Sequence, residues 1–576
     1  MREYFETELQ LLREESQEFA AAFPEQARML NLAAIKDRDP YVERLLEGVA
    51  YLTAQVRRRI DDDIPQVCES LLGQIWPHFL RPLPAMTILQ FAPRPGQLQQ
   101  SQTLDQGTMV LSRAVGEDRV PCRFRSSCAV ELQPLQINKV ELAEVSPGQT
   151  RLAIGLQLDA GLLADSLDLS TLKLYLHAGQ ATAVELHQAL TRDVKELRIT
   201  FPDNPEATAT LLPGQKALQP CHLGLDEMLT PLSGRSFFGF HLLHEYFGFL
   251  EKYLFVAIDS LEKVAWPEYC HSFEIEIQLN HTFGKEFKLQ RDNLRLHCAP
   301  AVNLFHLDSE PLSIDHRREE YRLVADGGAP EGIQVYSVDE VVGLEKKSGE
   351  RRQYRPMNSA AGQTGEDRFF QVVSRNYGAG PANYLSVGGD LRFTPETLSC
   401  AITASNGDYP RQFLVENTIQ GETATIPSYV QPTNLARPSR QLRPPANDDF
   451  RLALISHLSL NYSSLSSAEA LKRLLSLYDW TEQEQNRLRI EGISEVKVKP
   501  VDMIRQGTLT RGIRVELTIK EENFFSRADI HLFGLVLHEF LGMYATINSF
   551  VETRITCFPS NKEFTWQPKF GENFPI

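Results

Sequence analysis

Two amphipathic stripes of apolar residues open the chain. The first recurs at intervals of three and four positions, or their sum, and predicts a helix that ends at Pro24; its members are Phe5, Leu9, Leu12, Phe19 and Phe23. Asp39 and Pro40 then supply a helix cap and a first-turn proline. The second stripe has nearly heptad spacing and predicts a helix to about Ile60; its members are Val42, Leu45, Val49, Leu52 and Val56.

A break follows the second stripe at "DDDIP". The segment "QVCESLLGQIW" predicts a third, shorter helix, and "PHFLRPLPAMTILQF" then changes to proline-rich extended chain. So few helices bury their stripes poorly by themselves, so either the next domain or a helix of another chain must cover them. Heptad spacing fits both alternatives, and both stay open for this N-terminal helical segment, residues 1–84.

The middle of the chain predicts strands. Residues 85–342 contain short alternating runs such as "KLYLHAG", "ELRITFP" and "FEIEIQL", separated by Gly, Pro, Asn and Asp. Residues 343–449 hold two polar intervals, 343–368 and 422–449, whose composition is typical of mobile loops or linkers. We therefore predict a β-rich middle region followed by a linker-containing region.

The last region, residues 450–576, predicts the order β-α-β-β-α-β. "FRLALISHLSLNY" is strand-like, "SSAEALKRLLSLYDW" reads as a capped helix, "ISEVKVKPV" and "RGIRVELTIK" as strands, "ADIHLFGLVLHEFLGMY" as a helix and "FVETRITCF" as a last strand. This is the order of a ferredoxin-like split βαβ unit. The predicted fold class is α+β and multi-domain, with N-terminal amphipathic helices, a β-rich middle and this C-terminal unit.

Composition favours a multi-domain globular protein without nucleic-acid or membrane affinity. The 576 residues are 42% hydrophobic and 23% charged, and the formal charge of -16 opposes nonspecific attraction to nucleic acid or anionic lipid. The eight cysteines form no CxxC pair, which indicates buried thiols in a reducing compartment. The N-terminus lacks the order of a secretory signal, and charged residues interrupt the most apolar window, 237–258, so we expect a cytoplasmic protein without membrane insertion.

Candidate chemistry is strongest in "HLLHEYFGFLEKYLF", residues 241–255. His241, His244 and Glu245 share a helical turn, so a zinc site is geometrically conceivable. A zincin helix needs His-Glu-x-x-His, however, and the pairs His244-Glu245 and His538-Glu539 both lack the second histidine. We therefore predict that these histidines border an aromatic core or contact surface.

The remaining motifs predict no catalytic, cofactor-binding or metal-binding residue. Asp315, His316 and Glu319 in "DHRREEY" allow a hydrolytic or metal role in principle, but alternating charge on a solvated turn is commoner. There is no G-x-S-x-G elbow and no Walker A loop, and "GGAPEG" and "VGGD" are typical of turns. A metal-dependent hydrolase and a β-rich ligand-binding module remain the alternatives to an interaction protein.

Several long blocks resemble one known family. "DPYVERLLEGVAYLTAQVRRRIDDDIPQ", "LLGQIWPHFLRPLPAMTILQF", "EYFGFLEKYLFVAID", "CAPAVNLFHLDSEPLSIDHRREEYRLV", "LISHLSLNYSSL" and "LHEFLGMYATINSF" are similar, in this order, to the TssF (VasA/ImpG) baseplate subunit of type VI secretion systems. The resemblance spans nearly the whole chain. Family members often have proline where Leu250 stands, and residues 346–363 match nothing family-wide.

The resemblance implies an assembly role and no catalytic residue. It implies that two TssF copies join TssG, TssE and TssK in a wedge, and that six wedges surround the VgrG hub and support the contractile sheath. The resemblance also implies that the protein is cytoplasmic and is docked at the inner face of the cytoplasmic membrane through the baseplate and the membrane complex. Helices of the second copy and of TssG would cover the N-terminal stripes, so the predicted seam is Phe5, Leu9, Leu12, Leu45, Val49, Leu52 and Val56. The polar intervals 343–368 and 422–449 are predicted to act as flexible joints.

Overall fold

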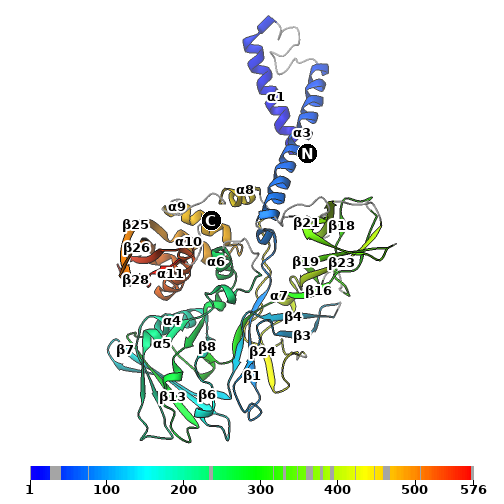
Figure 1. Ribbon diagram of the computed structural model, residues 1–576. Helices are drawn as coiled ribbons and strands as arrows, with labels where there is room; N and C mark the ends of the chain where they lie inside the picture. The colour runs from blue at the N-terminus through cyan, green and yellow to red at the C-terminus, as the bar shows by residue number, and fades with distance from the viewer. Residues whose placement is uncertain are drawn as a thin grey trace. The chain divides into compact units, whose positions relative to one another are not determined.

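The computed structural model is a multi-domain mixture of helices and sheets, rich in strand (Figure 1). The structure describes residues 2–25, 40–75, 77–117, 119–231, 238–315, 317–327, 332–346, 348–357, 368–376, 381–389, 395–421, 423, 425–445, 448–457, 467–505 and 507–571. The chain divides into two compact units. The first unit is Met1–Leu80 with Ala446–Ser459, and the second is Arg81–Pro445 with Leu460–Ile576.

The first unit is helical. It consists of α1 (Arg2–Ala22), α3 (Pro40–Ile75), the short 3-10 helix η1 (Pro77–Leu80) and α8 (Asp448–His457). The predicted break at "DDDIP" is wrong, because α3 continues through Pro65 to Ile75 and takes in the expected third helix. A proline inside a helix removes one hydrogen bond and costs about 3 kcal/mol. A helix of this length retains its other backbone bonds on both sides.

Helix α8 corrects a second prediction, the opening strand of the C-terminal unit. Phe450 and Leu454 are four residues apart and both buried, which is helical spacing, whereas Leu452 between them is exposed. The helix packs against α3. Residues 458–462 of the expected strand lie outside the described residues. Two of the other expected strands, β26 (Thr508–Lys520) and β27 (Ser549–Phe558), are parallel neighbours, whereas the sheet of a ferredoxin-like unit is antiparallel. The predicted ferredoxin-like split βαβ unit is therefore wrong.

A five-stranded antiparallel sheet forms the centre of the second unit. Its order is β24 (Val430–Asn434), β1 (Met86–Pro93), β15 (Cys298–Val302), β4 (Val120–Ser126) and β3 (Met109–Val115). Strand β24 comes from the polar interval 422–449, and its Val430 lies in the apolar core with Phe91 and Phe124. The prediction that this interval is a flexible joint is therefore wrong for β24, since its backbone is paired with β1 along its length.

Two further sheets lie in residues 135–295. One has the order β10 (Thr210–Pro213), β9 (Val194–Thr200), β13 (Ser272–Leu279), β7 (Gln149–Leu158) and β6 (Leu135–Ser146). The other has the order β11 (Leu218–Pro220), β12 (Phe255–Ile258), β8 (Leu172–Leu176) and β14 (Leu294–Arg295). Strand β13 alternates buried and half-buried positions throughout, so its predicted period-two pattern is confirmed. Helix α4 (Gln180–Thr191) contacts strands of both sheets.

The fourth large sheet has strands from residues 305–405. Its order is β16 (Phe305–Asp308), β23 (Glu396–Ser405), β19 (Gln334–Glu345), β20 (Arg351–Pro356), β21 (Arg368–Asn376), β22 (Pro381–Gly389) and β18 (Tyr321–Arg322), with β17 (Leu312–Ile314) also on β23. Within the first polar interval, residues 343–345 of β19 and 351–356 of β20 belong to two strands that pair antiparallel, so the mobile-linker prediction is wrong for them. Residues 358–367 of that interval lie outside the described residues. Within this sheet, Arg368 of β21 pairs with Glu396 of β23 and with the Tyr354 hydroxyl of β20, and all three are buried.

Short elements complete the second unit. They are the small β2 (Gln102–Leu104) and β5 (Val130–Leu132) pair, the helices α5 (Gly214–Ala217), α6 (Phe238–Gly248) and α7 (Tyr409–Phe413), and the 3-10 helices η2 (Ala164–Ser166), η3 (Leu225–Glu227), η4 (Leu250–Tyr253), η5 (Leu261–Lys263) and η6 (Arg291–Asn293).

The C-terminal sheet carries the most buried helix of the unit. Strands β25 (Ile493–Arg505), β26 (Thr508–Lys520), β27 (Ser549–Phe558) and β28 (Glu563–Thr565) follow in order, with β29 (Lys569–Phe570) also on β27. Helix α11 (Arg527–Gly542) connects the parallel neighbours β26 and β27. Preceding helices are α9 (Ala468–Tyr478) and α10 (Glu484–Glu491), and the 3-10 helix η8 is Glu521–Asn523. Because α11 packs on β27, α4 and α6, it is buried around nearly its whole circumference.

A histidine of this unit makes stability depend on pH. His281 lies beyond the end of β13, with Nδ1 3.0 Å from Asp193 Oδ2 and Nε2 3.5 Å from Glu185 Oε1. Hydrogen bonds with Asp193 and then Glu185 raise the pKa of His281 from 6.5 to about 9. A raised folded-state pKa stabilises the protein fully below the unfolded value of 6.5, and this contribution disappears as the pH rises from there through about 9.

We therefore expect the guanidinium concentration at the wild-type unfolding midpoint to decrease as the pH is raised from about 6.5 to about 9. For His281→Gln we expect a smaller decrease over the same pH range. Guanidinium titrations at several pH values measure this. Equal pH slopes for the two proteins would show that the His281 ion pairs contribute nothing to stability.

The prediction of buried thiols is confirmed for the described side chains. Cys122, Cys128, Cys221, Cys270, Cys298, Cys400 and Cys557 are all unpaired and buried. Burial raises the pKa of Cys122 to about 12 and the pKa of Cys270 to about 11, so both are protonated, unreactive thiols at neutral pH. The side chain of Cys68 lies outside the described residues.

Candidate functional site

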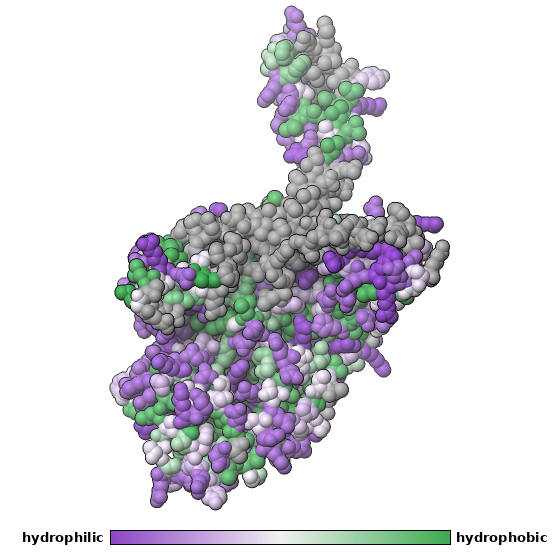
Figure 2. Space-filling view, in the orientation of Figure 1, coloured by the Kyte–Doolittle hydropathy of each residue, from purple (hydrophilic) through white to green (hydrophobic). Residues whose placement is uncertain are grey.

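An exposed apolar face on α3 is the main candidate for a contact surface. We name Tyr41, Leu45, Val49, Leu52 and Val56 the α3 apolar face. Leu45, Leu52 and Val56 expose 69%, 62% and 59% of their surface. Tyr41 is also exposed and lies four residues before Leu45, one helical turn away, which is the signal that would have added it to the predicted stripe. Figure 2 shows hydrophobic side chains gathered over α1 and α3.

Packing against α1 explains why this face is exposed. Helix α1 contacts α3, where the fully buried residues Ala50 and Ala54 lie one turn apart. Small side chains let two helix backbones approach closely, so α1 occupies this side of α3. At 100° per residue, Leu45, Leu52 and Val56 point to the opposite side. Leu45, Leu52 and Val56 of α3 therefore take no part in the packing between α1 and α3, which form an antiparallel helical hairpin.

Two ion pairs connect α1 with α3. Arg57 Nη1 lies 2.6 Å from Glu8 Oε1, and Arg13 Nη2 lies 3.1 Å from Glu43 Oε2. Glu8 is buried although it is charged, and Arg57 supplies the opposite charge. These contacts place residues early in α1 beside the later part of α3, so the two helices are antiparallel.

The predicted seam is split between the two sides of this hairpin. Phe5, Leu9 and Leu12 are half-buried and share the side of α1 that carries Glu8, which faces α3. Leu45, Val49, Leu52 and Val56 are exposed on the other side of α3. The structure therefore does not bring the seven residues onto one surface, and the α3 apolar face is the part that is available for a partner.

Glu245 belongs to a buried network in the aromatic segment. It lies on α6, is fully buried, and pairs through Oε2 with Lys252 Nζ at 2.6 Å. Its Oε1 accepts hydrogen bonds from the backbone N–H groups of Leu229 and Thr230, at 3.0 and 2.9 Å, and from the Thr230 hydroxyl at 2.9 Å. The carboxylate and ammonium are thus both paired, which a buried ion pair requires. The arrangement holds residues 228–230 against α6 and η4.

His241 completes this network as a neutral residue. Its Nδ1 lies 3.0 Å from the Thr230 hydroxyl oxygen. Because that hydroxyl donates its hydrogen to Glu245, the Nδ1 of His241 carries a hydrogen and donates to Thr230. Burial lowers the pKa of His241 to about 4, which agrees with an uncharged ring at neutral pH.

His244 points to a different neighbour. Its ring packs edge-on against Trp480, with ring centroids 3.9 Å apart, and burial lowers its pKa to about 3. On the same helix, Phe240 stacks on Tyr478 of α9, and Tyr246 contacts Phe533 of α11. The helix thus connects α9 and α11 through aromatic contacts, so the prediction of an aromatic-core border fits the described geometry.

The other charged motifs have structural partners as well. His538 Nδ1 lies 3.0 Å from the Thr553 hydroxyl of β27, and Glu539 pairs with Lys569. Asp315 Oδ1 accepts from the backbone N–H of Arg317 and from the Tyr321 hydroxyl. His316 lies outside the described residues. These contacts bind the motifs to their own turns and strands.

Comparison with known sequence families identifies the family of this chain. The family model described as "Type VI secretion system, TssF" matches residues 1–573. The chain belongs to the TssF family.

Relatives of known name and structure agree with this membership. The "Type VI secretion system component TssF1" of Pseudomonas aeruginosa is 31% identical, over 99% of this chain and 98% of the relative. A chain of the cryo-electron microscopy structure of the type VI secretion system TssK-TssF-TssG baseplate subcomplex is 31% identical, with a TM-score of 0.78 over 93% of this chain and 99% of that one. A chain of a type VI baseplate complex is 29% identical, with a TM-score of 0.64 over the full length of both.

One relative is thus named as a type VI secretion system component, and similar chains have been solved in baseplate complexes, one of which is a TssK-TssF-TssG subcomplex. Among the described helices of this TssF chain, none is both long and apolar enough to cross a membrane.

Proposed function

We propose that this chain is a structural, non-catalytic subunit of a type VI secretion baseplate and assembles with TssG and TssK. The observation that carries this proposal is the likeness, over 93% of the chain, to a subunit of the TssK-TssF-TssG subcomplex. Shared architecture over nearly the whole length means that the surfaces used in that subcomplex have counterparts here. The buried networks around Glu245 and Arg368 stabilise this architecture and leave their charged groups paired.

The finer part of the proposal concerns the wedge. Two copies of this chain join TssG, TssE and TssK, and the wedges surround the VgrG hub and support assembly of the contractile sheath. The baseplate would lie in the cytoplasm, docked at the inner face of the cytoplasmic membrane through the membrane complex. This part rests on the resemblance of the sequence blocks to the TssF family.

The α3 apolar face is the proposed contact with helices of TssG and of the second copy. Its spacing is nearly heptad, which suits packing against another helix through interlocking side chains. Burying one exposed leucine at such an interface contributes about 1.5 to 3 kcal/mol, so several together supply much of the affinity. Phe5, Leu9 and Leu12 then act indirectly, because they hold α1 on the side of α3 that faces away from the partner.

Deletion and complementation test the proposed function. In a bacterium that carries this system, removal of the coding region should abolish type VI secretion and sheath assembly, and the wild-type chain should restore both. Cells that secrete normally without the chain would contradict a baseplate role.

A further inference from the structure

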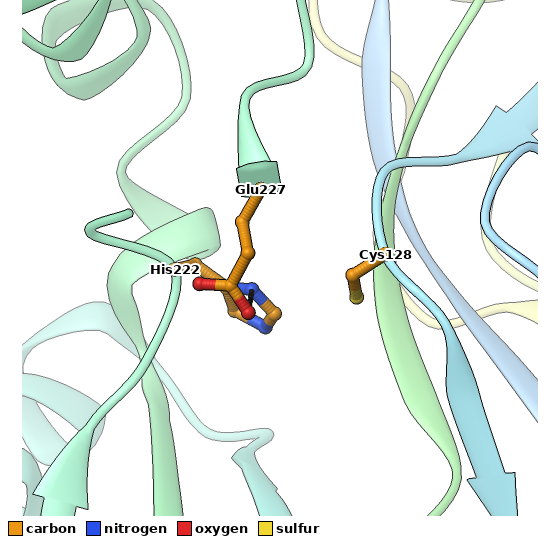
Figure 3. Close-up of side chains that lie close together, drawn as sticks. All are labelled: Cys128, His222 and Glu227. Carbon is orange, nitrogen blue, oxygen red and sulfur yellow. Dashed lines mark ion pairs between the residues drawn. The ribbon is translucent and has the colours of Figure 1, made fainter. Parts of the chain in front are cut away.

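A cysteine, a histidine and a carboxylate meet between two sheets of the second unit, although they are distant in sequence (Figure 3). Cys128 lies in the turn between β4 and β5, His222 follows β11, and Glu227 ends η3. One possible ligand atom from each lies within 4.8 Å of the other two. In Figure 3 the sulfur of Cys128 approaches from one chain segment, and the ring of His222 and the carboxylate of Glu227 approach from another.

His222 is the residue whose surroundings need an explanation. It exposes 1% of its surface, and neither ring nitrogen has a well-formed hydrogen bond, although Nδ1 lies 3.3 Å from Glu227 Oε1. Its φ of 62° is in the left-handed region, which few residues other than glycine adopt, although histidine is among the more frequent of them. The ring packs edge-on against Phe255, with centroids 4.5 Å apart. A buried imidazole without a well-formed hydrogen bond indicates a missing partner for the ring.

Neighbouring contacts hold the two sides of the cluster in place. The amide Nε2 of Gln106 donates to the backbone oxygen of Ser127 at 2.7 Å and to that of Asp226 at 2.9 Å. These two residues directly precede Cys128 and Glu227, so one side chain bridges both loops. Beyond Glu227, the backbone of residues 229–230 is bound by Glu245. The three side chains are thus preorganised by their surroundings, as ligands of a metal site are.

We propose that Cys128, His222 and Glu227 bind one zinc ion, with water as the fourth ligand, and that this ion connects the β4–β5 turn to the η3 loop. Sulfur, imidazole nitrogen and carboxylate oxygen are the ligand types that zinc takes in proteins. The Cys128 thiol releases its proton to solvent and the thiolate forms the Zn–S bond. Thiolate and carboxylate together then neutralise the two positive charges of the ion, which suits a mostly buried position.

The geometry requires only a small contraction. Bond lengths of about 2.0 to 2.3 Å around tetrahedral zinc place ligand atoms roughly 3.3 to 3.8 Å apart. The atoms here lie within 4.8 Å of one another, so side-chain rotations that move the ligand atoms by about 1 Å bring them to bonding positions. Glu227 is partly exposed, which gives the ion a route from solvent and a place for the water ligand.

Lys173 offers the competing explanation. Its Nζ lies 3.8 Å from Glu227 Oε1 and would repel a cation, but 41% of the lysine side chain is exposed and it is able to turn into solvent. If Lys173 alone balances the Glu227 charge, the cluster is an ordinary hydrogen-bonded network and zinc does not bind. If zinc binds, Lys173→Met removes a nearby positive charge and should tighten zinc binding severalfold.

The test uses the full-length, untagged chain after treatment with a chelator. Zinc titration with metal analysis should give one equivalent per chain, and cobalt in place of zinc should give a thiolate-to-cobalt charge-transfer band. We expect Cys128→Ser to remove the band, and Cys128→Ser, His222→Ala and Glu227→Gln each to weaken zinc binding at least about 100-fold. Cys270→Ser is the matched control, because Cys270 is also buried and its sulfur contacts the Ser272 backbone oxygen at 3.3 Å, a contact that serine is able to keep.

Failure of the wild-type chain to bind one equivalent of zinc, or a cobalt spectrum without a thiolate band, would overturn the site. A band that survives Cys128→Ser would overturn it too. The wild-type cobalt spectrum needs no variant, so the test remains decisive even where a substitution impairs folding. All of these measurements use the isolated chain, so their outcome is independent of the proposed baseplate function.

Discussion

Glu245→Ala is expected to destabilise the second unit by about 3 to 5 kcal/mol, which is a large part of the stability of an ordinary domain. The substitution leaves the Lys252 ammonium buried without its carboxylate, and the backbone N–H groups of Leu229 and Thr230 without their acceptor. An unpaired buried charge and unsatisfied donors are among the most destabilising changes that one substitution produces. Guanidinium unfolding, followed by tryptophan fluorescence and circular dichroism, measures the shift of the transition.

A matched surface pair and a double variant make this test specific. Glu141 forms a close ion pair with Lys139 on an exposed strand, so Glu141→Ala should leave the midpoint almost unchanged. Glu245→Leu combined with Lys252→Met removes both charges and should recover part of the loss that Glu245→Leu causes alone. A single Glu245 variant as stable as wild type would show that the pair does not support the fold.

The second large effect is expected at the α3 apolar face. Leu45→Asp together with Leu52→Asp should weaken assembly with TssG at least about 100-fold, because two charges would enter an apolar helix interface. The chain itself should remain folded, since both side chains are exposed in it. Co-purification with tagged TssG measures assembly, and circular dichroism of the free chain checks folding.

Val145→Asp provides the control for that experiment. Val145 is an apolar residue of β6 that exposes 64% of its surface, so the substitution adds a similar charge at a similarly exposed place outside the first unit. It should leave the complex with TssG intact. Equal recovery of TssG with the Leu45 and Leu52 variant and with wild type would remove the α3 apolar face from the interface.

Period-two patterns made many strands predictable from sequence, because alternation reports directly that one face of a strand is buried. In β13 the expected alternation runs through Phe273, Ile275, Ile277 and Leu279, all buried. The strand prediction at Phe450 is wrong because this segment has no alternating pattern that distinguishes a strand from a helix. Its short apolar run fits both a strand and a helix, and only packing of Phe450 and Leu454 selects the helix.

Charge and proline content were poor guides to flexibility. The interval that contains Val430 is rich in proline and charge, yet β24 pairs with β1, its alternate residues are buried, and Val430 lies in the core of the central sheet. Likewise, Pro65 indicated a helix end that α3 does not have. In β24 the long-range pairing with β1 outweighs the local preference of the residues. In α3 the length of the helix outweighs the local preference of Pro65.

The candidate sites were only partly predictable for geometric reasons. Heptad spacing found Leu45 and Leu52, but it does not say which side of α3 receives α1; the small residues Ala50 and Ala54 are the signal for that choice. The aromatic run around Glu245 indicated a buried border, whereas the role of Lys252 depends on the return of the chain through η4. Cys128 and His222 are distant in sequence and only the tertiary fold brings them together, so no local motif reveals them.

The mass of the complex between this chain and TssG tests the central claim most directly. The two proteins are to be co-expressed, purified through a tag on TssG and weighed by light scattering. The account predicts two copies of this chain with one TssG, and loss of that species when Leu45 and Leu52 are both replaced with aspartate. A folded chain that remains a monomer and does not bind TssG would contradict the baseplate assignment.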